Sequence, residues 1–341
     1  MIRIEETVIS NLILHRIGME EKRETVSSRP AGLLQGEEID TLKKILLKPF
    51  EKYAATFEFA HEMGIHYNVL FGLAKALAEG DDFIEISQKI LRHLVSVSKH
   101  PNIKEGDLFV AKFEDVWLEN KSYEGLGIYK FEEKETYIET AAADREMSMQ
   151  FKKGLGNRKP EKACLVIFTE EPYTLLIIDN SSADTDYWQN EFIKHKPKND
   201  PVNNTHDFLS LTKNFVTGRM PQEFKVNKAD QIDLLNRSVE YFKTHDTFDK
   251  AGFEEEVLHH DVIIESFRKF DQVYKKEHAV ELSDNFQISP QAVKKQARVF
   301  KSVLKLDKNF HVYIHGNREL IEQGVDEDGR KFYKIYYEQE S

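Results

Sequence analysis

The sequence predicts an α+β fold, and three patterns lead to that prediction. Strand-like runs gather in the middle of the chain, over residues 105–180, where apolar and aromatic residues partly alternate with polar ones. On either side of this region, apolar residues recur at every third or fourth position, which is typical of one face of a helix. Residues 309–337 alternate again around a turn. We therefore expect a central antiparallel sheet flanked by helices, and a helical second half that ends in a small β-hairpin.

The bulk composition indicates a soluble globular protein with more than one core. The chain has 341 residues, of which 40% are apolar and 31% are charged. We expect three regions: a strand and helices in 1–104, the sheet in 105–220, and helices with the terminal hairpin in 221–341. No apolar run approaches the roughly 20 residues of a membrane span. Residues 1–18 place acidic side chains ahead of their apolar part, unlike a signal peptide, so a cytoplasmic location without a membrane partner is the default expectation.

The N-terminal region is predicted to form one strand and several helices. Residues 1–18 begin by alternating apolar and polar side chains, which favours a strand. The helical pattern of residues 37–62 contains Pro49, so we expect two helices that meet at this proline. A further helix is predicted over residues 67–79, and Asp82 is placed to cap the next one. These helices are expected to pack on the sheet.

The stretch 105–139 organises the predicted sheet. Residues 107–116 are apolar and aromatic and predict a first strand. Gly125 and Gly127 are expected in the connector that follows, with residues 128–131 continuing as the second strand and a third strand completing one antiparallel unit.

Two more strands are predicted over residues 163–168 and 173–179, joined by the turn-like sequence TEEP. Cys164 lies in the first of them and is the only cysteine, which excludes an internal disulfide and a multi-cysteine zinc site. A thiol within an apolar strand is far more often an inert core residue than a nucleophile. We therefore expect Cys164 to have no catalytic role.

The net charge of −11 argues against a protein that simply coats nucleic acid, because phosphate binding depends on cationic side chains that release counterions. An acidic protein can still bind DNA through a local basic face, so the distribution of cations matters more than their sum. Two segments of this chain concentrate cations.

The first basic segment is residues 150–162, which we expect to be a flexible loop between strands. It opposes several cations to a single acid, Glu161; the cations include Lys152, Lys153, Arg158 and Lys159. Two alternatives stay open: a solvated hairpin connection, or a loop whose glycines and lysines contact phosphate. The single GLG falls far short of a phosphate-cradle motif.

The second basic segment is a helix predicted to start with Ser289 as its cap and Pro290 in its first turn. Its apolar stripe comprises Val293, Ala297, Phe300 and Leu304, and its basic flank comprises Lys294, Arg298, Lys301 and Lys305, with Lys295 beside them. The preceding helix, a connector and this helix loosely resemble a helix-turn-helix. The basic flank is either a solvated face or a surface for nucleic acid or an acidic partner.

Aromatic side chains offer a different kind of surface. Tyr187 and Trp188 are candidate anchors for a protein partner. The terminal hairpin carries several tyrosines: Tyr313, Tyr333, Tyr336 and Tyr337. These side chains can stack on bases, although such residues more often stabilise a small sheet or an oligomer interface.

Taken together, these segments resemble the bacterial 37-kDa nucleoid-associated protein family (YejK/NdpA-like proteins). The order and spacing of several segments carry the resemblance: VISNLILHRIG, EGDLFVAKFEDVWLENKSYEGLGIYKF, ACLVIF, YTLLIID, DYWQNEFIKHKPKND with THDFLSLTKNFV, and KNFHVYIHGNRELIEQGVDEDGRKFYKIYY. The resemblance covers nearly the whole chain. It implies a cytoplasmic, nucleoid-located protein, expected to be a homodimer, and it supplies no catalytic residues.

The function predicted from these observations is nucleoid-associated, DNA-proximal binding without catalysis. The basic helix and the loop at residues 150–162 would contact phosphates, without preference for sequence. The alternative is an adaptor for a DNA-acting protein such as a topoisomerase, with little DNA contact of its own. No nucleophile, paired acid and base, or metal-ligand spacing stands out, so we expect no enzyme, metal or cofactor.

Overall fold

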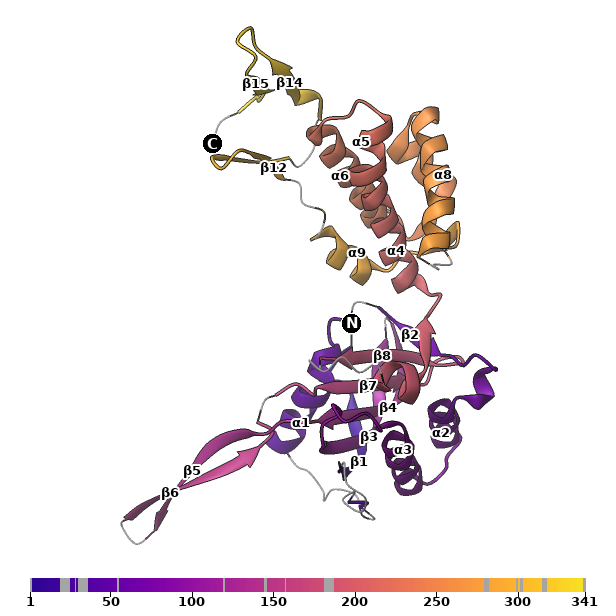
Figure 1. Ribbon diagram of the computed structural model, residues 1–341, viewed down its shortest axis with the longest axis vertical. Helices are drawn as coiled ribbons and strands as arrows, with labels where there is room; N and C mark the ends of the chain where they lie inside the picture. Colours follow the sequence, from indigo (N-terminus) through magenta and orange to yellow (C-terminus); the bar gives the residue numbers. More distant parts are fainter. Residues whose placement is uncertain are drawn as a thin grey trace. The chain divides into compact units, whose positions relative to one another are not determined.

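A computed structural model gives the fold of the chain (Figure 1). It describes residues 2–18, 25–27, 29, 36–53, 55–118, 120–143, 146–156, 158–180, 187–278, 282–298, 300, 303–314 and 318–339. The chain divides into two compact units, Met1–Lys198 (unit 1) and Asn199–Ser341 (unit 2). The finer division into 1–104, 105–220 and 221–341 stays a prediction.

Unit 1 is built on a seven-stranded sheet in the order β1-β3-β4-β7-β8-β2-β9, in which every pair of neighbours is antiparallel. Its strands are β1 (Val8–Ile17), β2 (Phe57–Phe59), β3 (Gly106–Leu118), β4 (Lys121–Phe131), β7 (Lys162–Ile167), β8 (Thr174–Asp179) and β9 (His195–Pro197). The predicted α+β fold with an antiparallel sheet is therefore confirmed. The short strands β2 and β9 extend this sheet beyond β8.

Helical segments cover both faces of this sheet. One face packs on α2 (Val69–Ala78), α3 (Phe83–Val97) and the π-helical segment η3 (Tyr187–Ile193), with the 3₁₀ turn η2 (Ile65–Tyr67) ahead of α2. The other face meets α1 (Glu37–Leu47) and the 3₁₀ turn η1 (Lys48–Phe50), where the Phe50 ring lies 6.2 Å from that of Tyr129. The predicted cap of α3 is confirmed, because Asp82 accepts a hydrogen bond of 2.8 Å from the Glu85 amide.

The helix predicted after Pro49 is wrong. The chain forms only the short turn η1 there and then enters β2, in which Phe59 is buried and Phe57 is half-buried. Both rings still reach the core of unit 1. An apolar spacing that suits a helix is thus met by a turn followed by a short strand, which lies between β8 and β9 in the sheet.

The connector predicted at Gly125 and Gly127 is also wrong, because both glycines lie inside β4. A Cβ atom on Gly127 would lie 2.5 Å from the Tyr129 ring and 2.6 Å from that of Phe113. At Gly125 it would lie 2.9 Å from the Val166 carbonyl oxygen. These glycines make room for aromatic rings and a neighbouring backbone within the sheet, not for a turn.

The third predicted strand does not join the central sheet. It is β5 (Glu135–Ala143), which pairs with β6 (Glu146–Gly154) in a separate two-stranded hairpin. Figure 1 shows this hairpin projecting from the body of unit 1. We call residues 135–154 the arm.

Unit 2 is mainly helical around a core rich in phenylalanine, and its elements fit the predicted helical second half with a terminal hairpin (Figure 1). Its helical segments are α4 (Pro201–Asn214), η4 (Phe215–Arg219), α5 (Met220–Glu223), α6 (Lys228–Thr244), α7 (Lys250–Phe253), η5 (Glu254–Leu258), α8 (Asp261–Glu277), α9 (Pro290–Ala297) and η6 (Arg318–Leu320). Its strands form three antiparallel pairs: β10 (Thr247–Asp249) with β11 (Asn285–Gln287), β12 (Val303–Leu306) with β13 (Phe310–Tyr313), and β14 (Ile321–Val325) with β15 (Lys331–Ile335). The last two pairs are hairpins. Within the described ranges, no helix is both long and apolar enough to cross a membrane.

A small second cluster attaches the terminal hairpins to α6. Leu304 of β12 and Ile321 of β14 are buried against Ile232 of α6. Polar contacts reinforce this packing, since Arg318 forms an ion pair of 2.6 Å with Asp230. The hairpins therefore have a defined place on unit 2.

Candidate nucleic-acid interface

Helix α9 carries the first part of the predicted basic surface. The predicted start is confirmed: the Ser289 hydroxyl caps the helix by accepting a hydrogen bond of 3.4 Å from the Ala292 amide, and Pro290 occupies the first turn. The buried side of the helix packs on α4 and α6. Its exposed cations are Lys294 and Lys295, followed by Arg298 at the C-cap. Partial burial lowers the pKa of Lys295.

The predicted single flank of four cations is wrong, because α9 ends at Ala297. Lys305 lies on β12, and Lys301 lies outside the described residues. The predicted apolar stripe is nevertheless buried in two separate places. Phe300 joins the main core of unit 2, and Leu304 joins the small cluster on α6. The helical spacing of these residues was therefore met by a helix followed by a strand.

The predicted helix-turn-helix arrangement is wrong as well. Between α8 and α9 the chain forms β11, which pairs with β10. A helix-turn-helix joins its two helices by a short turn, whereas here a strand intervenes. Any contact of α9 with DNA would have to use the exposed face of this short helix.

The cations of this region differ from most others in unit 2 because they have no acidic partners. Five are exposed, and none forms an ion pair within the described part of the chain: Lys294, Lys295, Arg298, Lys305 and Lys308. Elsewhere in the unit, Lys269 pairs with Glu265 at 2.8 Å and Lys243 with Glu240 at 3.4 Å. We call these five residues the basic surface. Their positive charge is not neutralised locally, so it is available to an anionic partner.

The β12–β13 hairpin places aromatic rings beside this charge. Lys305 pairs with His311, and Val303 with Tyr313, so Lys305, His311 and Tyr313 share one face of the hairpin. Tyr313 is 64% exposed and Phe310 63% exposed. A cation next to exposed rings is the combination that single-stranded nucleic acid uses for phosphate contact and base stacking.

The second predicted segment, residues 150–162, is not the expected flexible loop. Lys152 and Lys153 lie on β6, and Lys152 forms an ion pair with Glu139 of β5. Arg158 pairs with Glu133 at 2.8 Å. Lys153 and Lys159 are exposed and form no ion pair with a described residue. Ion pairs with Glu139 and Glu133 thus neutralise part of the positive charge of residues 150–162.

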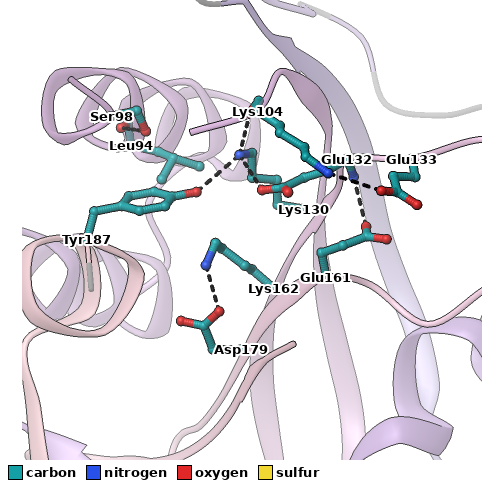
Figure 2. A network of polar contacts seen from close by, with 10 residues as sticks. All are labelled: Leu94, Ser98, Lys104, Lys130, Glu132, Glu133, Glu161, Lys162, Asp179 and Tyr187. Carbon is teal, nitrogen blue, oxygen red and sulfur yellow. Dashed lines mark hydrogen bonds and ion pairs between the residues drawn. The ribbon is translucent and has the colours of Figure 1, made fainter. Parts of the chain in front are cut away.

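Unit 1 contains a buried polar cluster that was not predicted from the sequence (Figure 2). Lys130 of β4 and Lys162 of β7 are paired residues on neighbouring strands, 0% and 1% exposed. The Lys130 ammonium donates to the Lys104 carbonyl at 2.6 Å, to Glu132 at 2.8 Å and to the Tyr187 hydroxyl at 3.1 Å. Lys162 donates to Asp179 at 2.6 Å. The available signal was a lysine near the apolar end of β4 and another at the start of the apolar strand β7.

This cluster joins the sheet to its covering segments and leaves little room for chemistry. Desolvation lowers the pKa of Lys130, with the hydrogen bond to Glu132 acting in the opposite direction. Desolvation also raises the pKa of Tyr187. All three ammonium hydrogens of Lys130 have an acceptor within the protein. The arrangement therefore stabilises the packing of η3 on the sheet, without a free donor for a ligand.

The predicted anchor patch at Tyr187 and Trp188 is wrong, since both rings are buried, at 4% and 0% exposure. They belong to η3 and pack in the core of unit 1. An aromatic residue with a polar group can be buried in a core as readily as at an interface. The tail tyrosines differ, because Tyr313, Tyr336 and Tyr337 are exposed.

Other chemistry-bearing groups are few in the described ranges. Cys164 is fully buried, and this burial raises the pKa of its thiol, as expected for an inert core residue. Where the chain is described, no three His, Cys, Asp or Glu side chains come together to hold a metal ion.

Comparison with protein families identifies a match over most of the chain. The family model NA37, described as nucleoid-associated protein YejK, matches residues 13–338. The matched range runs from β1 to beyond β15 and includes both units. Among curated proteins, none matches the chain.

Proposed function

The chain belongs to the family of nucleoid-associated protein YejK, and from this premise we propose that it binds DNA directly through the basic surface of unit 2. The proposal includes a location at the bacterial nucleoid and a role without catalysis. It assigns phosphate contacts to the five cations of the basic surface, which lie on α9 and on the β12–β13 hairpin.

The observation that carries this proposal is the absence of acidic partners around the basic surface. Between Ser289 and Ile314 the described residues contain five cations and one acid, Asp307, a local net charge of +4 in a chain of net charge −11. Phosphate contacts need such uncompensated cations, because DNA affinity arises largely from counterion release. The exposed Tyr313 beside Lys305 adds a ring for contact with unpaired bases.

The contacts proposed here carry no information about base sequence. Lysine and arginine on a short helix end and a hairpin suit the phosphate backbone, which is the same in every sequence. We therefore expect binding without sequence preference, and an affinity that falls steeply with salt. With five phosphate contacts, a fourfold rise in salt should weaken binding to duplex DNA by about 500-fold.

The test is a salt titration of binding to a non-specific duplex, followed by fluorescence anisotropy. The triple variant K294Q/K295Q/R298Q removes three of the five cations. The salt slope should then fall by about 2.7, and the same fourfold rise in salt should weaken binding only about tenfold. Circular dichroism would establish that unit 2 stays folded in the variant.

A matched control removes the same charge from elsewhere in unit 2. The variant K243Q/K269Q/R330Q neutralises three exposed cations that already pair with acids. It should keep the wild-type salt slope, because those cations have no free charge to offer. Equal slopes for the two triple variants would refute the basic surface as the DNA contact, and no binding at low salt would refute direct DNA binding altogether.

A second candidate function is favoured by the exposed rings of the terminal hairpins. Phe310, Tyr313 and Tyr337 are each more than 60% exposed, and aromatic side chains are enriched in protein interfaces. In this alternative the chain is an adaptor that binds a DNA-acting protein such as a topoisomerase. Recovery of the same partner after nuclease treatment, from the wild type but not from F310S/Y313S, would favour the adaptor.

A further inference from the structure

The arm in unit 1 is an exposed two-stranded ribbon with no covering element. Its strands β5 and β6 pair over nine residues, a length of about 30 Å. No other strand in the described ranges pairs with either edge. An isolated two-stranded hairpin is marginally stable in water, so the arm is expected to gain stability from a partner.

The two faces of the arm differ in character. On one face, Ile138 lies opposite Phe151, Thr140 opposite Met149, and Ala142 opposite Met147. We call these six residues the apolar face. The other face carries polar side chains, with Glu139 opposite Gln150 and Ala141 opposite Ser148. Because side chains alternate along each strand, the division into an apolar and a polar face runs along the ribbon.

The charge of the arm does not suit DNA. Its described residues contain three acids and two cations: Glu135, Glu139, Glu146, Lys152 and Lys153. One of the two cations, Lys152, already pairs with Glu139. The arm is therefore weakly acidic, and its apolar face is a surface for protein.

The exposed area of the apolar face is large for a monomer. Ile138 is 53%, Met147 73%, Met149 59% and Phe151 66% exposed. At roughly 200 Å² for each fully exposed side chain of this size, these four present about 500 Å². That is near the upper end for the largest apolar patch of a monomer. It is also over half of the about 800 Å² that each partner contributes to a stable interface.

We propose that the apolar face of the arm packs on the same face of a second copy of this chain, and so forms the homodimer interface. In a two-fold symmetric dimer each surface meets its own copy. The six residues of the apolar face carry no charge, so they can meet their own copies without repulsion between like charges. Lys153, opposite Thr136, is on the same side but lies at the base of the arm, beyond these six residues. On the polar face, Glu139 and Glu146 would meet like charges. In this dimer the two arms pack against each other and their apolar side chains interdigitate.

The oligomeric state of the full-length chain tests this proposal. Light scattering coupled to size-exclusion chromatography should give twice the mass of one chain for the wild type. This mass should stay the same when the protein concentration is varied about 100-fold. The variant M149E/F151E places two carboxylates on the apolar face of each arm and should be monomeric. A monomeric wild type would overturn the proposal and would favour a different protein as the partner that binds the apolar face.

A matched control lies on the same strand. The variant S148E/Q150E adds the same two charges at adjacent positions whose side chains are on the polar face. It should remain dimeric. If S148E/Q150E dissociated to the same extent as M149E/F151E, or if both stayed dimeric, the apolar face would not be the interface.

Cysteine cross-linking gives an independent measurement, because the single native cysteine is buried. Single cysteines at Met147, Met149 and Phe151 should yield a disulfide-linked dimer at one or more of these positions on mild oxidation. Cysteines at Ser148 and Gln150 should yield none. The reverse pattern, or cross-links with equal yield at all five positions, would contradict face-to-face packing of the arms.

Discussion

Removal of Lys130 alone should destabilise unit 1 far more than removal of Lys130 together with Glu132. Both side chains are buried, at 0% and 5% exposure, and their ion pair measures 2.8 Å. The substitution K130M preserves most of the side-chain length but leaves the Glu132 carboxylate buried without its cation. Breaking a buried pair from one side costs about 3–5 kcal/mol.

The double variant K130M/E132L should be less destabilised than the single variant. Desolvation lowers the pKa of Lys130, because burying the ammonium has a cost, and the hydrogen bond to Glu132 acts in the opposite direction. Replacing a buried ion pair by apolar side chains of similar size is often neutral or stabilising. Replacing both charges removes that cost along with the attraction. The remaining loss comes from the acceptors left without a donor, the Tyr187 hydroxyl and the Lys104 carbonyl, at about 1–3 kcal/mol.

Urea denaturation followed by tryptophan fluorescence measures this difference in unit 1 alone. The chain contains two tryptophans, Trp117 and Trp188, and both lie in unit 1. The signal is therefore insensitive to unfolding of unit 2, which would otherwise violate a two-state analysis. A loss below about 1 kcal/mol for K130M would refute the importance of the buried pair. A double variant as unstable as the single one would refute the argument from desolvation.

Two further predictions concern the packing of unit 1. The substitution G127A should destabilise unit 1 by about 1–3 kcal/mol, because its Cβ would lie within 2.6 Å of the Tyr129 and Phe113 rings. The control G72A changes an exposed glycine inside α2 with no atom near its Cβ, and it should stabilise unit 1 by about 0.5–1 kcal/mol. Urea unfolding curves with equal midpoints for the two variants would contradict both expectations. Cys164 should resist a thiol reagent in the native chain, because burial raises the pKa of its thiol and blocks access of the reagent. It should react fully in urea. Rapid reaction of the folded chain would show that β7 is not buried.

The sequence by itself determined the α+β class and the strand character of β1, β3, β7 and β8. In β1 and β3 apolar and polar residues partly alternate, whereas β7 and β8 are short apolar runs joined by a turn-like sequence, and both patterns are typical of strands. It also located the capped starts of α3 and α9, because Asp82 and Ser289 act through hydrogen bonds to amides three residues away. The family resemblance, read from the order of these segments, was confirmed by the match over residues 13–338.

The burial of individual residues and the ends of the helices and strands depend on tertiary packing, which a local sequence pattern does not show. Phe300 and Leu304 fit one helical stripe, yet each is buried in a different cluster because the chain leaves α9 at Ala297. Gly127 looked like a turn residue until the rings that occupy its side-chain space were known.

The candidate site depended on tertiary structure for the same reason. Charge is visible in a sequence, but neutralisation depends on which acid lies within a few ångströms. Lys152 meets Glu139 across a strand pair, whereas Lys294 meets no described acid. Likewise, Trp188 and Phe151 are both large apolar residues, and only packing decides that the first is in a core and the second on an open face. Burial and ion pairing arise between segments distant in the chain, and a local pattern contains no information about them.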